Sequence, residues 1–195
     1  MAAFQQGLIF TIGASVIQEN HEKKIFKFWQ LLIGKMIFYW CTAILSFTIT
    51  ILAIEKFLEI PSRVPLSSFL ILGGAFSFAI ISFGAFLASC FNQEVNFVRA
   101  SLIYPVPAFI FSGYTFPYES LSSSIQIIAN VFPFTWFANV LRELLLIGNT
   151  AHFEEKVFAI TTIGIFFLIS IFILNFSKNN INEHCHRNHL SKCLR

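Results

Sequence analysis

The sequence predicts an all-α fold: a polytopic membrane helix bundle with about five transmembrane helices and a re-entrant helical hairpin. Composition is the first reason, because 56% of the 195 residues are hydrophobic and only 12% are charged. Soluble domains are roughly 45–50% apolar and about 25% charged. Length is the second reason, since about 109 apolar residues (56% of 195) supply about five spans at roughly 20 residues each. Little remains for another domain, so we expect residues 1–195 to form a single transmembrane domain.

Uncharged apolar segments locate the expected spans along the chain. The first, at residues 2–17, is interrupted by Gln5 and Gln6. It would be only about 24 Å long as a helix, so it is a marginal span. Four longer segments follow, at residues 36–54, 66–91, 100–116 and 157–176.

Two of these segments contain residues that predict how their helices pack or bend. Small residues at helical spacing in 66–91 predict a narrow face where another helix can approach closely; they are Ala75, Ala79, Ser82, Ala85 and Ser89. Pro105 and Pro107 lie inside 100–116. We expect them to kink that span, because each removes a backbone donor from the helix.

Residues 117–148 have a different pattern, with two short stretches of helical apolar spacing that join at Pro133. The second stretch carries Arg142 and Glu143, which are costly in hydrocarbon unless protein or the interface surrounds them. We therefore expect 117–148 to form a re-entrant hairpin on the outer side. The two charged residues either line a substrate route or anchor a short helix at the lipid headgroups.

Lys and Arg residues divide unevenly between the two sides of the expected bundle, which predicts its orientation. Nine share the side of the C-terminus: Lys23, Lys24, Lys27, Lys35, Arg99, Lys178, Arg187, Lys192 and Arg195. Four lie on the other side: Lys56, Arg63, Arg142 and Lys156. Because basic residues favour the cytoplasmic side, we expect the segment at 18–34 and the tail at 177–195 in the cytoplasm. The N-terminal Met then lies outside, as expected for the later part of a longer protein.

Residues 18–34 begin with polar residues and continue with Lys alternating with aromatic residues. This pattern predicts a cytoplasmic amphipathic segment, with its rings at headgroup depth and its Lys side chains in water. Glu19, Glu22 and Lys23 at its start form either a docking surface for a partner or the solvated end of a helix.

No set of residues indicates catalysis, and we do not expect an enzyme or a cofactor. The chain lacks a phosphate-binding loop of the GxxxxGK[ST] form. All 10 acidic residues are Glu, so a Ser-His-Asp triad is impossible. His152, beside Glu154, is better explained as a solvated loop residue. The net charge of +3 is dispersed, which argues against a nucleic-acid partner.

The C-terminal tail holds the one cluster that resembles a metal site. Imidazoles and thiolates at short spacing can bind zinc or copper; the residues concerned are His184, Cys185, His186, His189 and Cys193. The alternative is an unstructured cytoplasmic tail. If the cluster binds metal, an alternative function for the chain is a non-transporting membrane protein with a metal-binding His/Cys tail.

The run from Phe111 to Ser120, FSGYTFPYES, together with the later FPFTWF around Pro133 and with Arg142, resembles the C-terminal signature of type-2 ABC exporter permeases. In that family a Ser-Gly-x-x-Phe-Pro stretch ends a span and leads into an outer re-entrant hairpin. The residues that match the motif, and that the resemblance implies for a gate, are Ser112, Gly113, Phe116, Pro117, Pro133 and Arg142.

The resemblance implies a permease subunit that moves substrate out across the bacterial inner membrane. Its partners would be the lipid bilayer, a separate ATP-binding cassette subunit, and a second permease half or a homodimer partner. Coupling to the ATPase would use Glu19, Glu22, Lys23 and Lys24. Gly34-Lys35 follows this cluster at a shorter spacing than in the family, which implies a shortened coupling element. The family's first span and external domain are missing here, so the chain resembles an N-terminally truncated or split form.

Overall fold

The computed structural model describes residues 2–19, 25–58, 64–91, 93–112, 122–148 and 152–193. Residues 2–5, 15, 18–19, 25–29, 31, 58, 146–147 and 175–193 are described as backbone only. Within these ranges all regular structure is helical, as expected. The elements are α1 (Ala2–Glu19), α2 (Ile25–Leu58), α3 (Leu66–Cys90), α4 (Glu94–Ile103), α5 (Pro105–Phe111), α6 (Ser123–Val131), α7 (Pro133–Arg142), the π-helix η2 (Glu143–Ile147) and α8 (Phe153–Cys193).

Three helical stretches among the described residues are long and apolar enough to cross a membrane: Leu32–Phe57, Leu66–Cys90 and Phe153–Leu174. The pair α6 and α7 raises the number to four if it counts as one broken span. These candidates correct the expectation of about five. Polar residues at both ends shorten the apolar part of α1, and the expected span at 100–116 is broken into α4 and α5 at Tyr104, directly before Pro105.

Two boundaries differ from the expected ones. The segment expected at 18–34 is not separate from the following span after residue 25, because α2 runs from Ile25 to Leu58 without a break. Neither Gly34 nor Lys35 stops the helix, and no proline lies within it. At the other end of the chain, α8 continues to Cys193. The expectation of an unstructured tail at 177–195 is therefore wrong for the backbone up to Cys193.

The centre of the bundle is α3, which packs against α1, α2, α7 and α8. All five small residues that predicted its packing face are buried. Glycines bring neighbouring helices closest: a Cβ atom at Gly84 would lie 3.1 Å from Ile9 Cα of α1. At Gly164 of α8 it would lie 3.1 Å from Ala79 Cα of α3. The close approach of helices that small residues permit in membranes is therefore used on two sides of α3.

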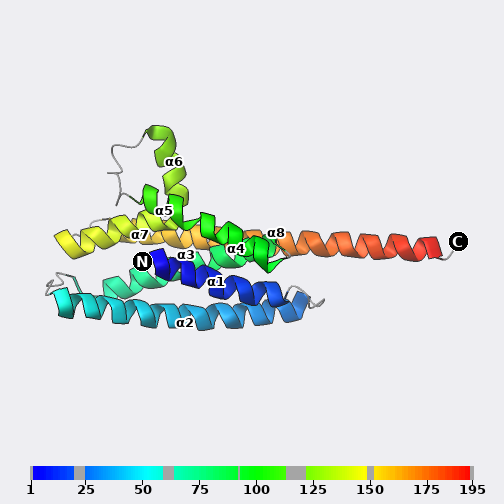
Figure 1. Ribbon diagram of the computed structural model, residues 1–195, viewed down its shortest axis with the longest axis horizontal. Coiled ribbons are helices and arrows are strands. Elements are labelled where there is room, and N and C mark those ends of the chain that lie inside the picture. The colour runs from blue at the N-terminus through cyan, green and yellow to red at the C-terminus, as the bar shows by residue number, and fades with distance from the viewer. Residues whose placement is uncertain are drawn as a thin grey trace.

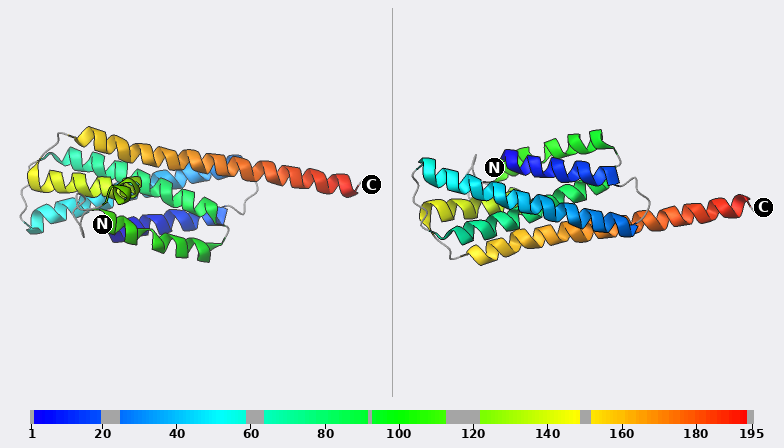
Figure 2. Two further views of the ribbon diagram at one scale, coloured as in Figure 1. Left: turned by 90° about the horizontal axis from the view of Figure 1, so that it is seen from above. Right: turned by 90° about the horizontal axis from the view of Figure 1, so that it is seen from below.

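The long helices lie roughly side by side, and α8 extends beyond the others toward the C-terminus (Figures 1 and 2). One end of the bundle holds the end of α1, the start of α2, the end of α3 and the start of α4 (Figure 1). The opposite end holds the end of α2, the start of α3 and the start of α8 (Figure 1). The expected division of the chain between two sides uses the same two groups of helix ends.

Candidate functional site

The candidate site is the hairpin formed by α6, α7 and η2, residues 123–147. It breaks at Phe132, whose backbone is extended (φ −83°, ψ 118°), and Pro133 begins α7. Proline disfavours helical geometry in the preceding residue and is well suited to the first position of a helix. The two helices meet at a bend of 95°. The predicted junction at Pro133 is confirmed.

The two arms of the hairpin have different environments. Phe137 of α7 stacks on Phe76 of α3 with ring centroids 4.1 Å apart, and Phe134 lies 6.0 Å from the same ring. By contrast, α6 projects from the bundle (Figure 1), and its Ile127 side chain is 71% exposed. The hairpin thus has one arm seated in the aromatic core and one arm outside it.

Contacts also hold the bend itself. The Trp136 Nε1–H group of α7 donates a hydrogen bond of 2.9 Å to the Asn130 carbonyl of α6. The Phe132 ring at the bend lies 5.5 Å from Tyr104 and 5.9 Å from Phe111. The bend therefore contacts both ends of α5. The distortion expected from Pro105 and Pro107 lies at the Tyr104 end.

An ion pair ties the end of the hairpin to α8. Lys156 Nζ donates to both carboxylate oxygens of Glu143, at 2.6 and 2.8 Å, and both side chains are partly buried. Gly148 ends η2 with φ at 71°, a left-handed conformation that glycine adopts without a steric penalty. This turn leads from the hairpin toward the start of α8.

In the sequence Glu143 neighbours Arg142, and Lys156 is expected only on the same side of the bundle. In the structure Glu143 reaches forward to Lys156 in the first turn of α8, and the Arg142 side chain is exposed. The signal in the sequence was two opposite charges on either side of a helix-ending glycine. Their pairing depends on the path of the chain between them, which the sequence pattern did not resolve.

Of the other motif residues, the structure describes the side chain of Ser112. Ser112 is buried just after α5, and its hydroxyl donates to the Phe109 carbonyl at 2.6 Å. Gly113, Phe116 and Pro117 lie outside the described residues. The hairpin expected at 117–148 stays a prediction, since residues 113–121 are not described.

The proposed coupling residues fall mostly outside the structure. Glu19 is the last residue of α1, described as backbone only, and Glu22, Lys23 and Lys24 lie between α1 and α2 in the part that is not described.

The tail cluster lies on the last turns of α8. His186 and His189 are three positions apart on this helix, and the side chains of His184, Cys185, His186, His189 and Cys193 are outside the description. Among the side chains that are described, no group of three His, Cys, Asp or Glu residues could hold a metal ion. His152 is exposed and faces Glu155 Oε2 at 3.3 Å.

The chain is similar to known membrane proteins of ABC transporters. A family model described as "ABC-2 family transporter protein" matches residues 1–179. Two curated proteins, each named "Probable multidrug ABC transporter permease YbhS", from Escherichia coli K12 and Escherichia coli O157:H7, are 23% identical to the chain over 121 residues. The match covers 62% of this chain and 32% of each relative. No solved structure matches the chain.

Proposed function

This chain belongs to the ABC-2 family of transporter membrane proteins, and we propose that it acts in an exporter driven by a separate ATP-binding cassette subunit. As a family member it is a multi-pass membrane permease subunit and not itself an enzyme. The observation that most supports an export role is the hairpin, with α7 seated on α3 and α6 outside the bundle. Such an arrangement has an arm that can move without dismantling the core.

The proposed gate consists of the hairpin and the helix pair α4 and α5. Transport that is coupled to ATP requires an element with two stable arrangements. The 95° bend at Phe132 and the interruption at Tyr104 are in contact through their aromatic rings. A tilt of α5 would therefore displace the Phe132 ring at the bend. Ser112, Pro133 and Arg142 are the described motif residues that we assign to this gate.

The proposed coupling site is the connection between α1 and α2, with Glu19, Glu22, Lys23 and Lys24. Both helices that it joins pack on α3, and α3 also contacts α7. If an ATP-binding subunit displaced this connection, the movement would be transmitted to the hairpin through α3. In this scheme the connection and the tail at 177–195 face the cytoplasm of a bacterial cell.

The chain spans about a third of the length of the curated relatives that it matches. We therefore propose that it works with a second permease half or with a second copy of itself. The complete transporter would contain these helices, their partner helices and the ATP-binding subunits.

Exchange of charges at the coupling site tests the proposal. The double variant Glu22→Lys with Lys23→Glu keeps the net charge and reverses the local pattern. We expect it to lower the permease-stimulated ATPase rate of the assembled transporter several-fold. The matched control is Glu55→Lys with Lys56→Glu, a neighbouring pair near the opposite end of α2, which should leave the rate unchanged. Equal ATPase rates in wild type and the Glu22/Lys23 variant, with assembly intact, would remove the docking assignment.

A further inference from the structure

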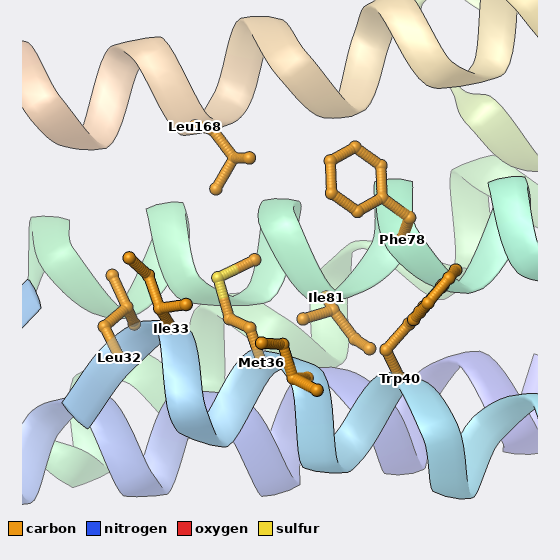
Figure 3. A pocket seen from close by; sticks show the side chains of 8 residues that line it. Leu32, Ile33, Met36, Trp40, Phe78, Ile81 and Leu168 are labelled. Carbon is orange, nitrogen blue, oxygen red and sulfur yellow. The ribbon is translucent and has the colours of Figure 1, made fainter. Parts of the chain in front are cut away.

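We propose that a groove between α2 and α8 holds one acyl chain of a bilayer phospholipid. The groove has a volume of about 440 Å³. Its walls are α2, with Met36 and Trp40, and α8, with Leu168, and its floor is α3, with Phe78 and Ile81. Figure 3 shows Met36 and Leu168 pointing toward each other across α3. The inference depends on the membrane setting of the chain and not on its coupling to an ATPase.

The chemistry of the groove excludes a polar occupant. All the side chains that line it are apolar apart from the indole N–H group of Trp40. That group already donates to the Gly74 carbonyl of α3 at 2.9 Å. A headgroup or a polar peptide would find no hydrogen-bond partner there, and burying a polar group without one is costly.

The groove is continuous with the surface that a multi-pass protein presents to lipid. Its α2 edge carries Ile33 and Ile37, which are 52% and 55% exposed, and the neighbouring face of α8 carries Ile169, which is 54% exposed. In the bilayer, acyl chains cover these side chains. A groove that opens between two lipid-facing edges is filled from the same surroundings, because an empty space beside packed side chains forfeits dispersion contacts.

The dimensions fit an acyl chain in one leaflet. The α2 residues in the groove run from Leu32 to Trp40, a rise of about 12 Å along a helix. One leaflet contributes about 15 Å of the hydrocarbon core, half of the roughly 30 Å total. These residues lie in the half of the span nearest Leu32. Ile81 and Leu168 lie in the matching halves of their own spans, and Phe78 lies at the midpoint of Leu66–Cys90. The chain therefore enters from the leaflet on the side of the start of α2.

A bound chain would also complete the packing of the bundle. Both α2 and α8 pack on α3, and the groove separates Met36 and Trp40 of α2 from Leu168 of α8. An acyl chain lodged between them would touch both helices and α3 at once. Adaptable side chains such as Met36 suit a flexible hydrocarbon partner.

Photolabelling distinguishes a bound chain from ordinary lipid contact. The full chain is reconstituted in vesicles of phosphatidylcholine that carries a diazirine in one acyl chain, and labelled positions are identified by mass spectrometry. If lipid only surrounds the protein, labelling follows exposure, so Phe38 (66% exposed) and Ile169 exceed the partly buried Met36. If a chain occupies the groove, we expect Met36 and Leu168 to be labelled at least twofold more than these exposed positions.

A matched pair of variants makes the test specific. Leu168→Phe adds volume inside the groove, whereas Ile169→Phe places a ring of the same size on the lipid-facing side of α8. We expect the first to reduce labelling at Met36 several-fold and the second to leave it unchanged. Labelling of Met36 that follows exposure, or that is insensitive to Leu168→Phe, would overturn the proposal.

A second copy of the chain is the competing occupant. In a chain whose four cysteines are replaced by serine, Ile37→Cys would then form disulfide-linked dimers under mild oxidation. Dimers together with weak labelling of Met36 would overturn the proposal and make the groove a contact between chains. Strong labelling of Met36 without dimers supports it.

Discussion

The ion pair between Glu143 and Lys156 links the last turns of the hairpin to the first turn of α8. It has two short contacts in a partly buried setting. Exposed pairs contribute about 0–1 kcal/mol and loss of one partner from a buried pair costs about 3–5 kcal/mol. This pair is partly buried, so we expect the loss of one partner to lower the free energy of unfolding by an amount between these two values.

We predict that Glu143→Gln lowers the free energy of unfolding by about 1–2 kcal/mol, because Lys156 is left partly buried without its charged partner. The measurement is the denaturation midpoint of the purified chain in detergent. Glu155→Gln is the matched control, since Glu155 faces His152 in an exposed pair and its loss should leave the midpoint unchanged. The charge swap Glu143→Lys with Lys156→Glu should recover part of the loss, and a midpoint equal to that of Glu143→Gln would contradict a direct pairing.

At the scale of elements, α3 owes its central place to small side chains. The sequence predicted a packing face on this helix from the spacing of alanine and serine, and all of those residues are buried. Ser82 and Ser89 satisfy their hydroxyls within the helix, by donating to the carbonyls of Phe78 and Ala85. A helix can therefore place serine at such a face without an unpaired group in the core.

We predict that Gly84→Ala lowers the free energy of unfolding by about 1–3 kcal/mol, because the added methyl group overpacks the contact between α1 and α3. A Cβ atom there would lie 2.7 Å from Ile12 Cγ2 and 3.1 Å from the Ile9 backbone. Gly7→Ala on α1 is the control, since a Cβ atom at Gly7 meets nothing within 4 Å. Its midpoint should stay the same or rise, because alanine favours helix more than glycine does. Equal effects of the two variants would contradict the close approach at Gly84.

At the scale of the whole molecule, the helix ends gather at two ends of the bundle (Figure 1). The uneven division of Lys and Arg predicts that the end with the start of α2 and the start of α4 faces the cytoplasm. If residues 117–148 form a hairpin, the start of α6 and the start of α8 lie on the same outer side. If these residues cross the membrane, the two positions lie on opposite sides.

We predict that single cysteines at Ser67, Ser123 and His152 react with a membrane-impermeant maleimide on intact cells, and that a cysteine at Gln93 reacts only after permeabilisation. All four positions are exposed in the structure. The variants are made after the native cysteines are replaced by serine, and labelling of permeabilised cells controls for reactivity. Opposite behaviour at Ser123 and His152 would contradict the hairpin. Labelling of Gln93 alone on intact cells would reverse the orientation.

The sequence by itself determined the features that depend on local chemistry. Uncharged apolar runs identified the helices at 66–90 and in the central parts of α2 and α8. The prolines indicated a distortion near Pro105, predicted as a kink and found as a break, and the junction at Pro133. The motif around Ser112, Pro133 and Arg142 indicated the family. These features are encoded by neighbouring residues, so a pattern along the chain is sufficient to find them.

The tertiary structure decided what depends on distant neighbours. It joined residues 25–34 to the following span, extended α8 through the polar tail, and paired Glu143 with Lys156 of the first turn of α8. It also placed Met36, Phe78 and Leu168 around one groove, although they belong to three helices. The ion pair and the groove join residues that are far apart in the sequence, so they depend on how the helices pack around α3.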